Sequence, residues 1–468
     1  MPFRLKRKDM TEKQIREFRE YLKTLGSVPG LDSIIHLCRK LGDPQDALSF
    51  IHIAGTNGKG SVGTFLSYGL AAAGLRVGRF VSPVLADERE AFLLLERKSV
   101  RGVAPGRSAG EKNFEIKQEM ISKRSYASCL SQVAKAGKAM QDEGLLHPTA
   151  FETDTALAFL WFLQKKCDIV VLECGMGGRL DSTNVVKTTL MEVITPISLE
   201  HTQFLGDTLE KIACQKAGII KPGSLVVSAL QDPAVTKVLK EECEKQAADL
   251  VTADPGGISK VTRKETGQSF LADGKHRLTI SLAGAYQVEN AYLAFAALRE
   301  LGRREKSRLK HLNEDAVRKG FACAVWPGRF QILRKKPYLV LDGAHNRAGA
   351  RALAESVKLY FPNRRIVYIM GVFRDKDVSG MVEETAALAS QILTVRLPDA
   401  NRSMEATELA REVAKVNPNV TVADSLQEAL EMACLLAGKD GVIIVFGSLS
   451  HLSGVTLLAE PAAMQRKV

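Results

Sequence analysis

The stretch that decides the fold reads Ile51-His52-Ile53-Ala54-Gly55-Thr56-Asn57-Gly58-Lys59-Gly60-Ser61. Its first residues are predicted to form a buried strand and a helix is predicted from Val62 onward, so the glycines fall at a strand-to-helix turn. Glycines let backbone N–H groups converge on an anion, and the helix N-terminus adds the positive end of its dipole. We therefore predict a phosphate-binding loop whose contacts come from six residues: Thr56, Asn57, Gly58, Lys59, Gly60 and Ser61.

The spelling of this loop differs from the common nucleotide-binding motif G-x-x-x-x-G-K-[ST]. Gly55 and Gly58 are three residues apart, and Gly60 separates Lys59 from Ser61. A glycine-rich turn without a ligand is the alternative interpretation. Lys59 can supply a point charge and Ser61 can reach a metal ion, and together they favour phosphate binding.

Short apolar runs recur on both sides of the loop, as expected for parallel strands that helices cover on both faces. They lie at residues 50–54, 168–173, 191–197, 224–228, 339–342, 366–371 and 442–446. Helical patterns lie between them, at residues 63–73, 154–163, 290–301 and 348–360. This alternation predicts an α/β fold.

The apolar runs form two series, and the turn-forming pair Pro327-Gly328 separates them. We therefore predict two domains. Residues 1–326 are expected to resemble P-loop ATPases with a mostly parallel sheet, and residues 327–468 to form a smaller Rossmann-like α/β domain. Residues 98–111, rich in Gly, Ser, Arg and Lys, are predicted to be a surface insertion.

The composition narrows the class of protein. The chain has 65 Lys and Arg against 53 Asp and Glu, a net charge of +12, which favours an acidic partner such as nucleic acid, a nucleotide or a polycarboxylate. No apolar run approaches the roughly 18 residues needed to span a bilayer, and we see no secretory signal, so no membrane segment is expected. Eight scattered cysteines without a C-x-x-C pair indicate reduced thiols in a cytoplasmic protein.

Further motifs follow the loop in a fixed order. They are SP at 82–83, TAFETDTALAF at 149–159, LECGMGGRLDSTN at 172–184, LEHTQFLGDTLEKIACQKAGIIKPG at 199–223, LAGAYQVENA at 282–291, WPGRF at 326–330, LDGAHN at 341–346, RDKD at 374–377 and FGSLS at 446–450. With these blocks the chain resembles folylpolyglutamate synthases and dihydrofolate synthases, within the wider Mur ligase family. Many ordered blocks are far more specific than any single motif.

The resemblance implies an ATP-dependent amide ligase. ATP would phosphorylate a carboxylate, either of dihydropteroate or the γ-carboxylate of a folate, and the amine of L-glutamate would then displace phosphate. Residues 1–326 would be the ATP-binding central domain and residues 327–468 the glutamate-ligase domain. The protein is expected to be a monomer that acts on small molecules, without nucleic acid or membrane.

The resemblance also implies a metal site and a catalytic set. Two Mg²⁺ ions would be held by Ser82, Glu173, His201 and a carbamylated Lys216, and the catalytic residues would be Lys59, His201 and Lys216. Glu173 ends an apolar strand and offers the hard oxygen ligand that Mg²⁺ prefers. The carbamate matters because an ammonium group repels a cation, whereas a carbamate carries a carboxylate.

By the same resemblance, other positions would contact the substrates. Those expected at the pteroate part are Phe151, Glu152, Leu180, Asp181 and Ser182. Those expected at the nucleotide, and in domain closure, are Asn290, Arg329, Asp342 and His345. Asp375-Lys376-Asp377 matches a block expected near the incoming glutamate.

The chain departs from the usual family pattern at four positions. Glu200 stands where Asp is usual, Gln215 where Glu is usual, Tyr286 where His is common and Arg347 where Pro is common. Gln215 removes a carboxylate beside Lys216, which puts metal affinity or carbamylation in doubt.

Three other functions compete with this interpretation. A cell-wall ligase of the same superfamily would carry a separate N-terminal domain, for which the residues before the loop are too few. A nucleic-acid-dependent NTPase would show a basic stripe with aromatic residues, which the sequence lacks. A non-catalytic scaffold is disfavoured by the complete set of expected ligands.

Overall fold

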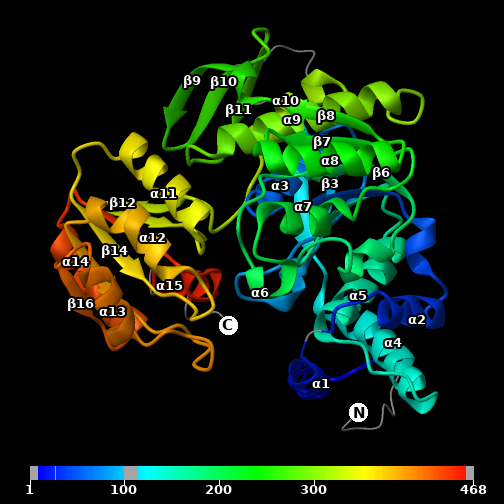
Figure 1. Ribbon diagram of the computed structural model, residues 1–468, viewed down its shortest axis with the longest axis horizontal. Helices are drawn as coiled ribbons and strands as arrows, with labels where there is room; N and C mark the ends of the chain where they lie inside the picture. The colour runs from blue at the N-terminus through cyan, green and yellow to red at the C-terminus, as the bar shows by residue number, and fades with distance from the viewer. Residues whose placement is uncertain (1–8, 27, 100–113, 460–468) are drawn as a thin grey trace. The chain divides into compact units, whose positions relative to one another are not determined.

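The computed structural model describes residues 9–26, 28–99 and 114–459, and the chain divides into two compact units (Figure 1). Unit 1 contains residues 1–83, 88–255 and 291–323, and unit 2 contains residues 84–87, 256–290 and 324–468. Most of the insertion predicted at 98–111 lies outside the described residues. The domain boundary at 326/327 stays a prediction.

Unit 1 is built on an eight-stranded sheet with the order β4-β3-β2-β5-β1-β6-β7-β8. The strands from β2 to β8 in that order are parallel, and β3 and β4 extend the edge in antiparallel fashion. The strands are β1 (Phe50–Ala54), β2 (Val77–Phe80), β3 (Phe92–Ser99), β4 (Phe114–Met120), β5 (Ile169–Glu173), β6 (Thr189–Ile194), β7 (Leu225–Ala229) and β8 (Asp249–Ala253).

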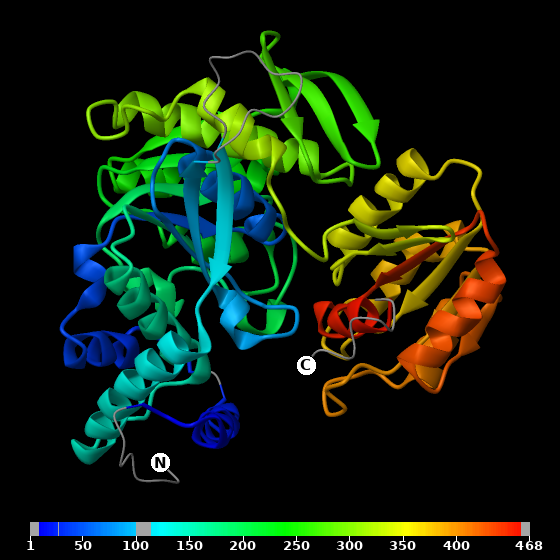
Figure 2. The same cartoon turned by 180° about the vertical axis from the view of Figure 1, so that it is seen from behind.

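Helices cover both faces of this sheet (Figures 1 and 2). On one face, Gly63 of α3 lies against the side chains of Ile53 and Val171. On the other face, α7 and α8 share an apolar cluster with Ala54, Ile194 and Val226. The longer helices are α1 (Glu12–Thr24), α2 (Asp32–Lys40), α3 (Lys59–Ala72), α4 (Lys123–Asp142), α5 (Ala150–Gln164), α7 (Leu209–Ala217), α8 (Pro233–Lys245), α9 (Gln287–Arg304) and α10 (Glu314–Ala322); shorter ones are η1 (Pro44–Ala47), η2 (Glu88–Ala91), η3 (Ser182–Val185) and α6 (Thr202–Leu205).

Unit 2 contains two sheets. A six-stranded sheet has the order β12-β13-β17-β14-β15-β16 and is parallel apart from β12, and a small antiparallel sheet has the order β11-β10-β9. The strands are β9 (Ile258–Lys264), β10 (Gly267–Ala272), β11 (His276–Ile280), β12 (Gln331–Lys335), β13 (Tyr338–Leu341), β14 (Ile366–Met370), β15 (Gln391–Thr394), β16 (Val420–Val422) and β17 (Val442–Phe446). The helices are η4 (Pro255–Gly257), α11 (Arg347–Tyr360), α12 (Val378–Thr385), η5 (Ala386–Leu388), α13 (Ala406–Ala414), α14 (Leu426–Ala437), η6 (Leu449–His451) and α15 (Leu452–Ala459).

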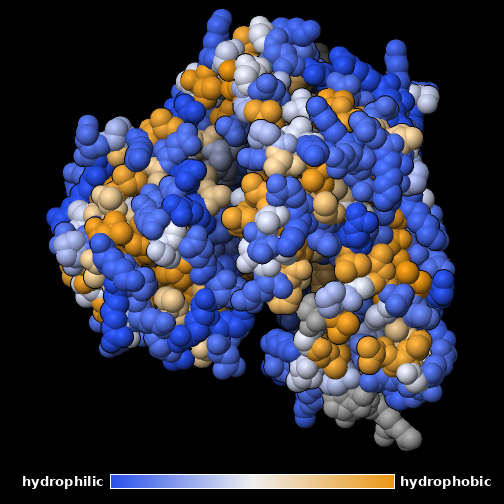
Figure 3. All heavy atoms as spheres, in the orientation of Figure 1, coloured by the Kyte–Doolittle hydropathy of each residue, from blue (hydrophilic) through white to orange (hydrophobic). Residues whose placement is uncertain are grey.

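The predicted α/β fold with mostly parallel sheets is therefore confirmed. Predicted strands 50–54 and 442–446 match β1 and β17 residue for residue. Within the part of the chain that the structure describes, no helix has the length and apolar character needed to cross a membrane. The face in Figure 3 carries mainly hydrophilic side chains with small apolar groups between them.

Glu192 of β6 is a buried carboxyl in the core of unit 1, with no exposed surface. Burial disfavours its charged form and raises its pKa to about 7, and nearby Lys221 offsets only part of this effect. In the unfolded chain the pKa returns to its ordinary lower value. The protein therefore loses stability as the pH rises from about 4.5 to about 7, because over this range the unfolded chain ionises first.

Glu192→Gln is expected to stabilise the protein at pH 8 by up to about 3 kcal/mol, because glutamine cannot ionise and keeps the volume of the side chain. At pH 4 the two proteins should be equally stable. Urea unfolding at both pH values measures the difference, with Glu241→Gln on the surface of α8 as the matched control. An equal gain at both pH values would show that ionisation is not the cause.

Candidate functional site

The phosphate loop, defined as residues 54–61, is held by the segment that follows β6. Thr56 N–H donates to the Pro196 carbonyl at 2.9 Å, and the Thr56 hydroxyl donates to the Ser198 carbonyl at 3.1 Å. Gly58 has φ = +90° and is followed by α3, which begins at Lys59 rather than at the predicted Val62. Lys59, Gly60 and Ser61 therefore form the first helical turn, whose N–H groups have no carbonyl within the helix to bind.

Two features require glycine at position 55: its positive φ and the lack of room for a Cβ atom. Its φ is +149°, and a Cβ at this position would lie 1.9 Å from Thr195 Oγ1 and 2.9 Å from the Thr195 carbonyl oxygen. The backbones of β1 and β6 thus approach too closely at the start of the loop to admit any side chain.

Gly55→Ala is expected to cost about 2–3 kcal/mol of stability, because the added methyl group forces the loop away from Thr195. Thermal unfolding of the purified protein measures this cost. Gly74→Ala is the matched control for a positive-φ glycine, since nothing lies within 4 Å of a Cβ there. If Gly55→Ala and Gly74→Ala lose equal stability, the loss comes from the positive φ alone and not from a clash with Thr195.

Two cations lie at the phosphate loop. Lys59 Nζ donates to the carbonyls of Gly55 at 3.1 Å and Thr56 at 3.2 Å, so its side chain folds back over the loop. Arg79 of β2 is fully buried and donates to the Gly60 carbonyl at 2.6 Å. The sequence analysis missed Arg79, although a charged residue within an otherwise apolar strand was a signal.

Lys216 of α7 also contacts the phosphate loop, although it lies 161 positions from Gly55 in the chain. Its Nζ donates to the Gly55 carbonyl at 2.7 Å, and the side chain is 4% exposed. Burial, together with the nearby charge of Lys59, lowers the pKa of Lys216 to about 7, while Glu200 opposes this shift. The environment of Lys216 therefore favours the neutral amine more than that of an exposed lysine does.

The other predicted metal ligands follow adjacent strands of the sheet. Glu173 is the last residue of β5 and is 7% exposed, and Ser82 follows β2. Because β2, β5, β1 and β6 are parallel neighbours, their carboxyl ends meet at one edge, where the phosphate loop also lies. The sheet therefore brings Ser82 and Glu173 to the same edge as Gly55.

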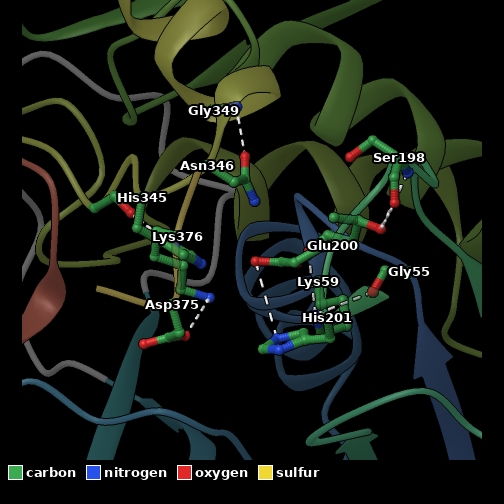
Figure 4. A network of polar contacts seen from close by, with 12 residues as sticks. Gly55, Lys59, Ser198, Glu200, His201, His345, Asn346, Gly349, Asp375 and Lys376 are labelled. Atoms are coloured by element: carbon green, nitrogen blue, oxygen red, sulfur yellow. Dashed lines mark hydrogen bonds and ion pairs between the residues drawn. The ribbon is translucent and has the colours of Figure 1, made fainter. Parts of the chain in front are cut away.

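His201 lies in the segment after β6, at the start of α6, and has φ = +53°. Its Nε2 lies 4.0 Å from Glu200 Oε1 (Figure 4). The side chain of His201 is 34% exposed. Glu200 thus lies beside His201, and its charge also raises the pKa of Lys216 against the effect of burial. The departure from the usual Asp at position 200 retains the carboxylate.

The second glycine-rich loop, defined as residues 174–182, packs against α5 and α7. The ring of Phe151 fills the space beside Gly175, where a Cβ would lie 2.6 Å from Cζ. The Arg179 N–H donates to the Gln215 carbonyl at 2.7 Å, so the residue before Lys216 anchors this loop through its backbone.

The five predicted substrate residues differ in what their side chains do. Glu152 is buried and accepts hydrogen bonds from Thr149 N–H (2.7 Å) and hydroxyl (2.8 Å) in a capping box at the start of α5. Asp181 accepts from the N–H groups of Met176 (2.8 Å) and Thr183 (3.0 Å). Leu180 is 49% exposed, whereas Ser182 is buried. Their contacts with substrate stay a prediction.

In unit 2, Asp342 is the centre of a buried polar group. It accepts hydrogen bonds from the Tyr286 hydroxyl at 2.7 Å, Phe330 N–H at 2.9 Å and Ala344 N–H at 2.8 Å. Burial raises the pKa of Asp342, and these donors oppose the shift. Tyr286, at a position where the family commonly has His, therefore donates a hydrogen bond to the carboxylate of Asp342.

The remaining predicted residues of unit 2 lie close to this group or at the start of α9. The guanidinium of Arg329 packs against Gly343, and His345 Nδ1 lies 2.8 Å from the Gly343 carbonyl. Asn290 is buried and donates to Gln287 at 3.2 Å. His345, Asp375 and Lys376 lie together in Figure 4, with Lys376 Nζ 3.8 Å from Asp375 Oδ2.

Comparison with known proteins agrees with this geometry. Residues 123–298 match the Mur ligase middle domain, and residues 328–449 match the Mur ligase glutamate ligase domain. A dihydrofolate synthase/folylpolyglutamate synthase of Bacillus subtilis is 32% identical over 92% of this chain and 95% of its own length. The chain belongs to the folylpolyglutamate synthase and dihydrofolate synthase family. This confirms the resemblance drawn from the ordered motifs.

Solved structures of this family agree in fold. Folylpolyglutamate synthase of Mycobacterium tuberculosis, complexed with ADP and AMPPCP, has a TM-score of 0.81 at 28% identity and covers 96% of this chain and 99% of its own. FolC of Escherichia coli, in complex with DHPP and ADP, has a TM-score of 0.78 at 26% identity, covering 97% and 98%. The family fold thus extends over nearly the whole chain.

Proposed function

We propose that this protein uses ATP to join L-glutamate to a folate, to dihydropteroate, or to both, through an acyl-phosphate intermediate. The observation that carries the proposal is that Lys59 and Lys216 both donate to the carbonyl of Gly55, at the sheet edge where β5 ends with Glu173 and β2 ends shortly before Ser82. The N-terminus of α3 and the charge of Lys59 suit the transfer of a phosphoryl group to a carboxylate, in which negative charges must approach one another.

The nucleotide is proposed to bind with its phosphates at residues 56–61. The relatives whose structures contain ADP share this fold, which supports ATP as the ligand. The first turn of α3 supplies N–H donors, and Lys59 supplies a charge that can leave its two carbonyl contacts for a phosphate. Asn290, Arg329, Asp342 and His345 are proposed to contact the nucleotide.

The residues present fit magnesium that is bound partly by the nucleotide. Among residues 9–26, 28–99 and 114–459, no group of three or more His, Cys, Asp or Glu side chains forms a complete metal site. Mg²⁺ commonly takes one or two carboxylates plus phosphate oxygens and water, so a sparse protein set suits it. Glu173, Ser82 and His201 would hold the ions, which would neutralise charge on the phosphates.

Lys216 is proposed to be carbamylated. The amine must be neutral to react with carbon dioxide, and burial beside Lys59 lowers its pKa to about 7. The resulting carbamate would place a negative charge beside the phosphate loop and favour a second cation there. Gln215, which lacks the usual carboxylate, anchors the second loop through its carbonyl and does not remove Lys216 from the site.

The protein groups divide the chemical work as follows. Lys59 and the first turn of α3 orient the γ-phosphate, and the second glycine-rich loop with Phe151 is proposed to orient the acceptor. The acceptor carboxylate attacks the γ-phosphorus, ADP leaves, and the amine of glutamate then displaces phosphate to form the amide. Exposed Leu180 offers an apolar contact for an aromatic acceptor.

One assay tests this function. Purified protein with MgATP and L-glutamate is given dihydropteroate or tetrahydrofolate, while phosphate release and product mass are followed. Glutamate-dependent phosphate release with at least one acceptor, and a product heavier by one glutamyl residue, are expected. A folded protein inactive with both acceptors would overturn the proposal. A cytoplasmic location, which eight free cysteines support, and a monomeric state are also proposed.

A further inference from the structure

A buried chain of polar side chains lies beneath the two glycine-rich loops. His52 of β1, two residues before Ala54, has its Nε2 2.8 Å from the hydroxyl of Thr183. The Thr183 hydroxyl donates to Asp181 Oδ1 at 2.5 Å, and Asp181 Oδ2 accepts the Met176 N–H at 2.8 Å. The strand that enters the phosphate loop is thus connected to the second loop by four consecutive groups.

The direction of the hydrogen bonds in this chain follows from their chemistry. Since the Thr183 proton is donated to Asp181, its oxygen is left to accept the proton of His52 Nε2. Burial lowers the pKa of His52 to about 3, so the imidazole is neutral and carries a proton on one nitrogen. His52 therefore acts as a hydrogen-bond donor and not as an ion.

The hydrogen bond between His52 and Thr183 lies in a buried environment. His52, Thr183 and Cys174 are at most 1% exposed, so water does not replace a lost partner. The Cys174 thiol, next to Glu173, lies 3.1 Å from His52 Nε2. The same imidazole thus contacts both ends of the segment that contains the second loop.

We infer that His52 is a positioning residue that fixes the second glycine-rich loop relative to the phosphate loop, through Thr183 and Asp181. In the proposed function, on which this inference rests, the first loop holds the γ-phosphate and the second loop the acceptor. Their relative position sets the distance between the attacking oxygen and phosphorus, and small displacements in such geometry reduce turnover strongly. Asp181 then serves catalysis through the loop that it braces.

The test uses His52→Leu, Thr183→Val, their combination and His52→Gln, whose amide can replace the Nε2 donor. His52→Leu and Thr183→Val are each expected to lower kcat about tenfold while changing the dissociation constant for MgADP less than twofold. The double variant should be no worse than the more impaired single variant, because both break one connection. His52→Gln should recover at least half of wild-type kcat.

The matched control is Thr385→Val in α12, a buried threonine whose hydroxyl donates to the Met381 carbonyl at 2.7 Å. It should leave kcat unchanged. Additive losses in the double variant, or wild-type kcat in folded His52→Leu and Thr183→Val, would overturn the inference. Thr183→Val keeps the test valid if His52→Leu does not fold.

Hydrogen–deuterium exchange separates this inference from the proposed function. Peptides covering residues 174–182 should exchange at least threefold faster in Thr183→Val than in wild type, whether or not the protein turns over a folate. Unchanged exchange in this loop would overturn the inference. Absence of turnover in the wild type would instead overturn the proposed function.

Discussion

Lys216→Ala is expected to reduce glutamate-dependent phosphate release about 100-fold or more, while the protein remains folded. The substitution removes the buried Nζ that donates to the Gly55 carbonyl, and with it the group proposed to become a carbamate. Initial rates at saturating MgATP measure the effect, and thermal unfolding shows whether the fold survives. Lys211→Ala, on the exposed side of the same helix, is the matched control and should keep full activity.

Lys216→Arg distinguishes the two roles that Lys216 could have. Arginine keeps the positive charge but does not form the carbamate. If the carbamate is required, this variant should be as impaired as Lys216→Ala, and mass spectrometry under carbon dioxide should detect an added 44 Da on the wild-type peptide alone, by the mass of the carbamate's carbon dioxide. Unimpaired turnover by Lys216→Ala would remove Lys216 from the mechanism.

Lys59→Met is expected to lower kcat about 100- to 1,000-fold, since one positioned cation for the γ-phosphate is lost. Methionine keeps an unbranched side chain of similar length, so the first turn of α3 should form unchanged. Affinity for MgADP, measured by calorimetry, should fall much less than kcat, because Lys59 would act mainly on the transferred phosphoryl group.

The control for Lys59→Met is Lys40→Met in α2, which removes an exposed lysine paired with Glu143. That variant should be fully active. If Lys59→Met lowers MgADP affinity as much as it lowers kcat, then the lysine contributes equally to the ground and transition states, and its proposed catalytic role is wrong.

The strands that the sequence predicted are those buried on both faces. Residues 50–54 and 442–446 are apolar at nearly every position and are covered by helices on each side, so their pattern survives in the structure. The antiparallel sheet β9–β11 was missed because its strands lack the continuous burial of β1 and β17. In β9, for example, none of the seven residues is buried, and no apolar run marks it.

The predicted site was only partly accessible from sequence. The phosphate loop could be located because its glycines, lysine and serine are contiguous. The Lys216–Gly55 hydrogen bond joins residues 161 positions apart, so it depends on how β1, β6 and α7 pack. A local signal for Glu152 did exist, since Thr149 and Glu152 have the spacing of a capping box. His52 required the structure, because only its burial and its contact with Thr183 separate it from an ordinary strand residue.

The small sheet β9–β11 precedes α9 in the chain but packs within unit 2. Gln268 of β10 donates to the carbonyls of Leu282 and Gly284, and the Ala285 N–H donates to Ser356 of α11 at 2.9 Å. During synthesis on the ribosome this sheet emerges well before α11. The contact of Ala285 with α11 can form only after α11 has been synthesised. A recombinant fragment that ends near residue 324 would expose the packing surfaces of residues 256–290, so the two units are better expressed as one polypeptide than as separate pieces.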